Sequence, residues 1–367
     1  MKLFLFLSFL GFSVNSISKT IVFIDNTVSN DTYIASNKER QISLAYQMGL
    51  KKLQKNCKLE SKQLIGNEPL SVFTQAKEVE AIKGDKILFG LIHSSEALLA
   101  AEAFKASNII ALSSGAATDK LNEKNASFFS LANPVTDISN HVGEYIANKK
   151  IKKPIAIIPG DSSYSVELAK SLKAALSEKS LDLQIHLVDS SKNHREIIAK
   201  IINKKGYDFI YVPGFLQQTM PIFESVSRTD FKGIVYGSAN LARSNTDLKL
   251  FSDSLKLKDL TFRFPATWLS GETSFSKTLE HEFFVANKEE IMGTAIYTYD
   301  AVLIAGSFLC RNSGEINKDR FSKFIKEEVL KGKVPTVRKY LGLKNGHLLS
   351  RISTVKYNSE LQKLEVE

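Results

Sequence analysis

The chain alternates between short apolar runs and longer stretches in which apolar residues recur every three or four positions. Thr20–Asp25 is an apolar run typical of a buried strand, and Gln41–Gln54 has the spacing of an amphipathic helix. The same order recurs in Lys86–Ile92, a predicted strand, Glu96–Lys105, a predicted helix, and Ile109–Leu112, a further strand. Such alternation predicts a mostly parallel sheet with helices on both faces.

A second unit with the same order follows. Its predicted strands are Pro154–Ile158, Leu183–Val188, Phe209–Val212 and Gly233–Tyr236, and its predicted helices are Val166–Ser177, Glu196–Lys204 and Met220–Val226. Between the units, Asn133-Pro134 interrupts the pattern within Leu131–Asp137. A length of 367 residues allows two packed units or one large barrel, and the repeated order favours two doubly wound α/β units.

The last hundred or so residues add further helices and a hairpin. We expect a strand at Leu260–Pro265, helices at Ser274–Asn287, Ala295–Leu309 and Phe321–Glu328, and an antiparallel hairpin of Leu348–Val355 and Leu361–Val366. The strand would leave the second unit, and the hairpin would turn around Tyr357–Glu360.

Met1–Thr20 has the composition of a secretory signal peptide. Lys2 precedes a Leu- and Phe-rich run that is shorter than the roughly 20 residues needed to cross a bilayer. Ser16 and Ser18 offer cleavage sites, and neither is followed by Cys, so lipid attachment is not expected. We expect no later segment to be long and apolar enough to anchor the chain, and therefore predict a soluble periplasmic protein.

The basic balance of the chain does not by itself indicate a nucleic-acid partner. The net charge is +10, but the lysines are scattered as pairs such as Lys51-Lys52 and Lys149-Lys150. A nucleic-acid site would need a clustered basic stripe interleaved with aromatic residues. We therefore predict no nucleic-acid partner, while an acidic membrane face or protein partner stays open.

Cysteine and histidine positions bear on redox state and metal binding. Cys57 and Cys310 could form one disulfide in an oxidising compartment, although the sequence does not fix the pairing. The six histidines show no close pairing with each other or with cysteine, and His281-Glu282 lacks the second histidine of a zinc-binding helix. No nucleophile–base set is visible either, so we predict no metal, cofactor or catalytic residue, and no enzyme activity.

Short motifs follow several predicted strands in a fixed order. They are Gly90–Ser95, Ser114–Thr118, Gly160–Tyr164, Val212–Gly214 and Tyr299–Ala301. In the order and spacing of these motifs, over nearly all of the mature chain, the protein resembles the type I periplasmic solute-binding proteins of the branched-chain amino-acid-binding (Leu/Ile/Val-binding) family.

The resemblance implies two doubly wound lobes joined by three crossovers. The crossovers are expected near Leu131–Pro134, Arg263–Ala266 and Asn345–Leu348. The expected division is a signal peptide at 1–18, lobe one at 19–132 plus 267–345, and lobe two at 133–266 plus 346–367. Ligands of such folds lie in the cleft at the carboxyl ends of the strands.

On the first lobe, four residues are candidates for ligand contact. Ser94 and Ser95 follow a predicted strand and open a helix, so their hydroxyls and free N–H groups could hold an anion such as a carboxylate. Alternatively, Ser95 only caps its own helix. The resemblance implies that the backbone of Ala116 and the hydroxyl of Thr118 hold the ends of an amino acid, and the alternative is an ordinary helix-cap turn.

On the second lobe, the resemblance places three candidates. Tyr164 and Phe215 stand where relatives carry aromatic rings over the ligand, although either could be an ordinary half-buried aromatic residue. Ser238 stands where amino-acid-binding relatives commonly carry an acid, and a buried ammonium without a carboxylate partner is costly. Asn26–Asn30 also lacks the family's usual Pro-Leu-Ser/Thr-Gly signature. His93 replaces a cysteine that some relatives pair with a helix-one cysteine, so it is expected to pack in place of that bridge.

Two functions are consistent with this sequence. The first is an extracytoplasmic protein that closes on a small polar ligand, one that could carry a carboxylate, and presents it to the membrane permease of an ABC transporter. The second is a docking or regulatory module of the cell envelope that keeps the fold without a ligand. The neutral Ser238 and the missing signature at Asn26–Asn30 favour the second.

Overall fold

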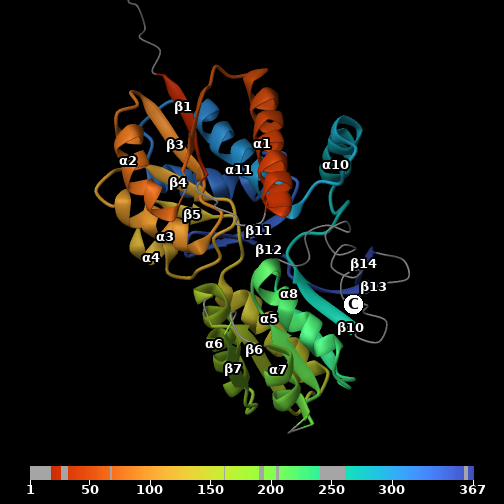
Figure 1. The fold of residues 1–367 in the computed structure, drawn as a ribbon. Coiled ribbons are helices and arrows are strands. Elements are labelled where there is room, and N and C mark those ends of the chain that lie inside the picture. The colour runs from red at the N-terminus through yellow and green to blue at the C-terminus, as the bar shows by residue number, and fades with distance from the viewer. Residues whose placement is uncertain are drawn as a thin grey trace, which may run out of the picture.

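The computed structural model describes residues 18–25, 32–66, 68–160, 162–189, 194–203, 206–239, 261–358 and 363–367. The chain forms two α/β lobes, each built on one seven-stranded sheet (Figure 1). Most neighbouring strands are parallel, which confirms the predicted pair of doubly wound units. The proposed signal peptide, apart from Ser18, and the segment Asn26–Asn30 lie outside the described residues, as do Asp161 and Asn240.

Lobe one contains the beginning of the chain and a long late segment. Its sheet has the order β11 (Tyr340–Lys344), β12 (His347–Ser350), β5 (Phe128–Ser130), β4 (Ile110–Ser113), β3 (Asp85–Gly90), β1 (Lys19–Asp25), β2 (Glu60–Ile65). Its helices are α1 (Thr32–Gln54), α2 (Val72–Glu80), α3 (Ser94–Ala103), α4 (Leu121–Lys124), α10 (Ser274–Asn287), α11 (Gly293–Arg311) and α12 (Lys318–Phe324). The sequence patterns had not indicated β2, α2 or β5.

Alternation along β1 shows how the sheet of lobe one divides two cores. Ile21 and Phe23 pack with α1 and α11, whereas Val22 and Ile24 pack with α2 and α3. Successive strand residues point to opposite faces, so an uninterrupted apolar run indicates a strand covered on both sides. The run at Thr20–Asp25 therefore has the burial that its composition predicts.

Lobe two repeats this arrangement. Its sheet has the order β14 (Lys363–Val366), β13 (Ser353–Asn358), β10 (Thr261–Ala266), β9 (Ile234–Gly237), β8 (Phe209–Val212), β6 (Pro154–Pro159), β7 (Gln184–Val188), and its helices are α5 (Val135–Asn148), α6 (Ser163–Ser177), α7 (His194–Asn203) and α8 (Leu216–Ser227). Ile155 and Ile157 of β6 pack with α7 and α8, and Ala156 and Ile158 pack with α5 and α6. A terminal antiparallel hairpin is present as β13 and β14, but the expected first strand Leu348–Val355 is divided between β12 of lobe one and β13, and Tyr357 belongs to β13 rather than to the turn.

The third connection between the lobes lies later in the chain than expected. β12 pairs with β11 and β5 in the sheet of lobe one, so the chain crosses at Arg351-Ile352 rather than within 345–348. The physical reason is Asn345-Gly346, whose φ angles of 47° and 77° form a tight hairpin turn between β11 and β12. Asn-Gly is a strong signal for such a turn because both positions need positive φ.

One buried guanidinium ties the three connections together. Arg338 is fully buried and donates from Nη1 to the carbonyl of Leu131, at 2.7 Å, on the first connection. Its Nη2 donates to the carbonyl of Thr267 on the second connection, at 3.3 Å, and to the hydroxyl of Ser350 at the third. Asn133 also donates to the carbonyl of Ser350, at 2.8 Å. The hinge is therefore a bonded network centred on Arg338.

Asp300 holds the loop that carries Arg338. Its carboxylate accepts the backbone N–H groups of Val337, at 2.6 Å, and Arg338, at 3.1 Å, and the hydroxyl of Tyr340 at 3.1 Å. Burial raises the pKa of Asp300 to about 6, against the opposing effect of these hydrogen bonds. Asp300, the acidic residue of the Tyr299–Ala301 motif, therefore stabilises the hinge loop.

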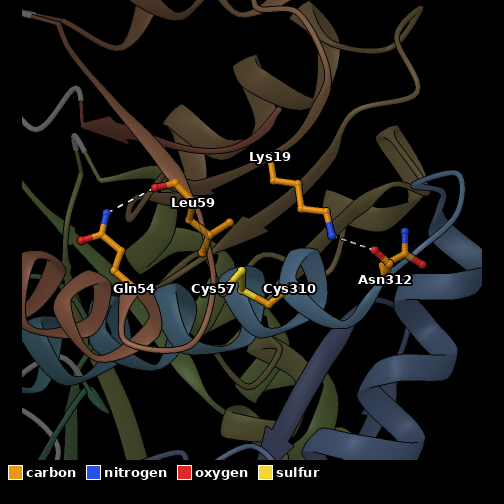
Figure 2. The surroundings of a disulfide bond; sticks show 6 residues. All are labelled: Lys19, Gln54, Cys57, Leu59, Cys310 and Asn312. Atoms are coloured by element: carbon orange, nitrogen blue, oxygen red, sulfur yellow. Dashed lines mark hydrogen bonds between the residues drawn. A yellow bond between two sulfur atoms is a disulfide. The ribbon is translucent and has the colours of Figure 1, made fainter. Parts of the chain in front are cut away.

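A disulfide joins Cys57, just after α1, to Cys310 near the end of α11, with 5.8 Å between the Cα atoms (Figure 2). This finding fixes the pairing that the sequence left open. The same two helices also pack closely where Gly49 of α1 faces Val302 of α11. A Cβ at Gly49 would lie only 2.8 Å from Cγ1 of Val302. Lobe one is therefore fastened both covalently and by close helix packing.

Helix α11 departs from one expectation drawn from the sequence. By length and composition alone, Gly293–Arg311 is apolar enough to cross a membrane, although no later segment was expected to be. Within the structure, 83% of its apolar window is buried, against α1, β1 and β3 of lobe one. The apolar character of α11 is accounted for by its place in the core of lobe one.

Candidate ligand-binding cleft

A cavity lies between the lobes, at the carboxyl ends of the central strands. It is lined by Ile92, His93, Ser94, Ser114, Gly115, Ala117, Ala132, Asn133, Ile138, Tyr164, Phe215, Ala239, Thr267, Trp268, Gly293, Thr294 and Tyr297. These residues follow β3, β4, β6, β8, β9 and β10, begin α11, or belong to the connections between the lobes. This position is where open α/β sheets bind ligands, because loops and helix starts converge there.

Three of the seven predicted site residues line the cavity. Ser94 is the first residue of α3, and Phe215 immediately precedes α8. Tyr164 lies in the first turn of α6, with its ring centroid 5.3 Å from that of Phe215. Phe215 also meets His93 of lobe one edge to face, at 5.1 Å between centroids. The two lobes therefore touch through aromatic rings at the cavity.

Ser95 and Ala116 do not line the cavity. Ser95 is exposed on α3. It is not the N-cap residue of that helix, because this position is His93, whose side chain makes no capping hydrogen bond. The Ala116 N–H donates to the hydroxyl of Ser113 at 2.8 Å, and its carbonyl accepts from the hydroxyl of Ser130 at 2.6 Å. The backbone groups of Ala116 are thus already bonded within lobe one.

Thr118 and Ser238 are also engaged away from the cavity lining. The Thr118 hydroxyl donates to Glu167 of α6 at 3.1 Å, which links lobe one to lobe two. The Ser238 hydroxyl donates to the carbonyl of Gly214 at 2.6 Å and is fully buried. Both hydroxyls have protein partners in this structure.

Burial raises the pKa of Glu167, with a smaller contribution from the charge of Asp119. The hydrogen bond from Thr118 and the charge of Lys120 act in the opposite direction. The link between Thr118 and Glu167 is therefore sensitive to protonation of one of its members.

The structure adds cleft residues that the sequence patterns had not singled out. Trp268, the only tryptophan of the chain, directly follows the second connection, and Tyr297 lies in the first turns of α11. The Tyr297 hydroxyl is bonded to that of Thr267, and the Arg338 guanidinium lies 4.0 Å from the Tyr297 ring centroid. A single tryptophan next to a predicted crossover was the available signal, since tryptophan is enriched at binding sites.

Four of the described helices begin at the cavity without a side-chain cap. They are α3, α5, α8 and α11, whose N-cap residues are His93, Pro134, Phe215 and Met292. Helix N-termini carry partial positive charge and free N–H groups. Among the cavity-lining residues that the structure describes, none is Asp, Glu, Lys or Arg. Backbone dipoles and neutral side chains therefore set the local electrostatics.

Comparison with known proteins supports this architecture. No protein-family model matches the sequence, and no curated protein matches it either. Among solved structures, the leucine-binding protein LivK of Thermotoga maritima is similar with a TM-score of 0.76 and 12% identity, over 96% of this chain and 98% of that one. LivJ of Streptococcus pneumoniae, solved with isoleucine, gives 0.72 and 15%, over 95% and 99%. A solute-binding protein of an R. palustris ABC transporter, solved with benzoate, gives 0.76 and 12%, over 95% of each chain.

Sheets, helices and crossovers thus define a two-lobe, doubly wound α/β fold. More specifically, the chain has the fold of the type I periplasmic binding proteins, and its structural neighbours belong to the branched-chain amino-acid ABC transporter family. The resemblance first indicated by the strand-end motifs is confirmed at the level of the fold.

Proposed function

We propose that this protein is an extracytoplasmic solute-binding protein, which closes on a small ligand between its lobes and delivers it to the permease of an ABC transporter. One observation carries the proposal: a single cavity receives residues from both lobes and from the hinge. A ligand that touches both lobes favours the closed state by its additional contacts there. By name, LivK is a leucine-binding protein, LivJ is the substrate-binding protein of a branched-chain amino-acid transporter, and the R. palustris protein is the solute-binding protein of an ABC transporter.

In this proposal Ser94, Tyr164 and Phe215 contact the ligand, together with Trp268 and Tyr297. Lobe one and the hinge supply hydrogen-bond donors, and the rings of Tyr164 and Phe215 cover the ligand from lobe two. Aromatic rings are suited to this task because they bury a large area and lose little conformational entropy. Contact between His93 and Phe215 would form as the lobes close.

A binding role is supported over a catalytic one by the chemistry of the cavity. A general base needs a group that orients it, commonly a carboxylate. The described lining residues include His93 and Ser94 but no Asp or Glu. Export to an oxidising compartment is supported by the disulfide between Cys57 and Cys310, by the leader-like N-terminus and by one structural neighbour, from Burkholderia xenovorans, that is named a periplasmic ligand-binding protein.

A thermal-shift screen of the mature protein tests the proposal. The library would contain amino acids, small carboxylates, amides, polyamines, sugars and nucleosides. A ligand at 100 times its dissociation constant stabilises the folded state by about 2.7 kcal/mol, enough to raise Tm by several degrees. The shift should shrink in Phe215→Ala and persist in Phe284→Ala, whose ring is exposed on α10.

A silent screen would favour the alternative, a docking module of the cell envelope. The observation in favour of that alternative is that Ala116, Thr118 and Ser238 bond to the protein itself. The two outcomes are therefore distinguishable with one experiment.

A further inference from the structure

The cavity contains two buried hydrogen-bond donors that have no partner. Nε1 of Trp268 and Oγ1 of Thr294 are both shielded from solvent; the indole N–H donates no hydrogen bond in the structure, and the hydroxyl neither donates nor accepts one. Both residues line the cavity, and Thr294 lies in the first turn of α11. Buried polar groups nearly always have a partner, so two unpaired donors in the lining of one cavity would be completed by an ordered water or by an acceptor group of a ligand.

The start of α11 offers hydrogen-bond donors to the cavity. Its first turn has free N–H groups at Gly293 and Thr294, because its N-cap residue Met292 supplies no side-chain cap. The buried Arg338 lies 4.0 Å from the Tyr297 ring centroid, but its charge is balanced by Asp300 and Glu272. An indole N–H, a hydroxyl and helix N–H groups together suit an acceptor that carries negative charge.

An ammonium group would find no matching charge among the described residues of the cavity. Several described carboxylates near the cleft have other partners: Glu167 accepts from Thr118, Asp119 from Thr136, and Asp300 from the hinge loop. Glu272 accepts from the backbone of Leu269 and interacts with Arg338. Burying an ammonium without an anionic partner is costly. The remaining lining is aromatic or apolar, with Ile92, Ile138 and Phe215 among its members.

Resting on the proposed function, we propose that the ligand is a small carboxylic acid with an apolar or aromatic body and no ammonium group. The carboxylate binds at the start of α11, where it accepts from Thr294 Oγ1 and Trp268 Nε1. The body lies against the rings of Tyr164 and Phe215. This places the anionic group at α11 rather than at Ser94 on α3.

Matched ligand pairs test the inference directly. The wild-type protein would be titrated with 4-methylpentanoate against leucine and with 3-phenylpropanoate against phenylalanine, which differ only by the ammonium group. Fluorescence of Trp268 reports binding, because it is the only tryptophan of the chain and lines the cavity. Benzoate against benzamide tests the need for negative charge. We expect each acid to bind at least about tenfold more tightly than its partner.

Tighter binding of the amino acids would overturn the inference while leaving the proposed function intact, and would locate the ammonium's partner outside the described residues. Absence of binding by all six compounds, together with a silent thermal-shift library, would overturn both.

Two substitutions test where the carboxylate binds. Thr294→Val removes the hydroxyl and keeps the shape, and should weaken binding of the acids about tenfold. Thr278→Val, on the exposed side of α10, is the matched control and should change nothing. Equal affinity in Thr294→Val and wild type would overturn the placement at α11, and a larger loss in Ser94→Ala would place the carboxylate at α3.

Discussion

The two walls of the cleft differ in composition. Lobe one and the connections supply most of the lining, including the polar side chains of Ser94, Ser114, Thr267 and Thr294. Among the residues that the structure describes, lobe two supplies Ile138, Tyr164, Phe215 and Ala239, as a mainly apolar cover. Hydrogen bonds fix orientation, whereas apolar contacts exclude water without strong directional demands. Under the proposed function, we expect lobe one to position the ligand and lobe two to enclose it.

The largest effect is expected at the hinge that holds the two walls in register. Arg338→Met should lower the free energy of unfolding by about 3–5 kcal/mol, because it leaves the carbonyls of Leu131 and Thr267 without their buried donor. Urea denaturation measures this loss. Arg351→Met, at the exposed third connection, is the matched control and should cost little. Equal losses in the two variants would contradict the central role of Arg338.

The stability of lobe one, which supplies the polar wall, should depend on the disulfide. Replacement of both Cys57 and Cys310 by alanine should lower the free energy of unfolding by about 2–4 kcal/mol. Thermal unfolding with and without a reducing agent measures the same quantity in the wild-type protein. The reductant should have no effect on the double variant, and an equal response of both proteins would show that the bridge does not stabilise lobe one.

The apolar wall should control how long a ligand stays. Phe215→Ala removes the ring that meets both Tyr164 and His93, so it should raise the dissociation rate about tenfold with little change in the association rate. Stopped-flow measurement of Trp268 fluorescence separates the two rates. A loss confined to the association rate would show that Phe215 guides entry instead of enclosing the ligand.

The smallest effect concerns the link between the walls. The folded state raises the pKa of Glu167, so it binds the proton more tightly than the unfolded chain does. The free energy of unfolding of the wild-type protein, relative to that of Glu167→Gln, should therefore be highest below the ordinary pKa of 4.5. It should fall as the pH rises toward the raised pKa of Glu167. Tm measured for both proteins on either side of this window tests the sign. Parallel curves would show that Glu167 does not titrate there.

Local sequence patterns predicted the helices and strands better than they predicted the contacts between side chains. Apolar runs such as Thr20–Asp25 mark strands because burial on both faces leaves a visible pattern. The tight turn at Asn345-Gly346 was equally visible, and reading it would have placed the third connection correctly. By contrast, β2 has only one buried residue in six and carries almost no apolar signal at the sheet edge.

Site residues were harder to predict because their hydrogen-bond partners come from distant parts of the chain. The hydroxyl of Thr118 meets Glu167, 49 positions away, and that of Ser238 meets the carbonyl of Gly214. A strand-end motif locates a side chain near the cleft but does not determine which neighbour it bonds. Tyr297 was missed for the related reason that its place depends on how α11 packs in lobe one.

The disulfide also has a topological consequence. The bond joins residues 253 positions apart, and the closed loop includes all five parallel strands of lobe two. The first and second connections lie inside this covalent ring, and the third lies outside it. A protease that cuts lobe two once between Cys57 and Cys310 would therefore leave two fragments still joined by a covalent bond. Separation of the fragments on a denaturing gel would then require a reducing agent.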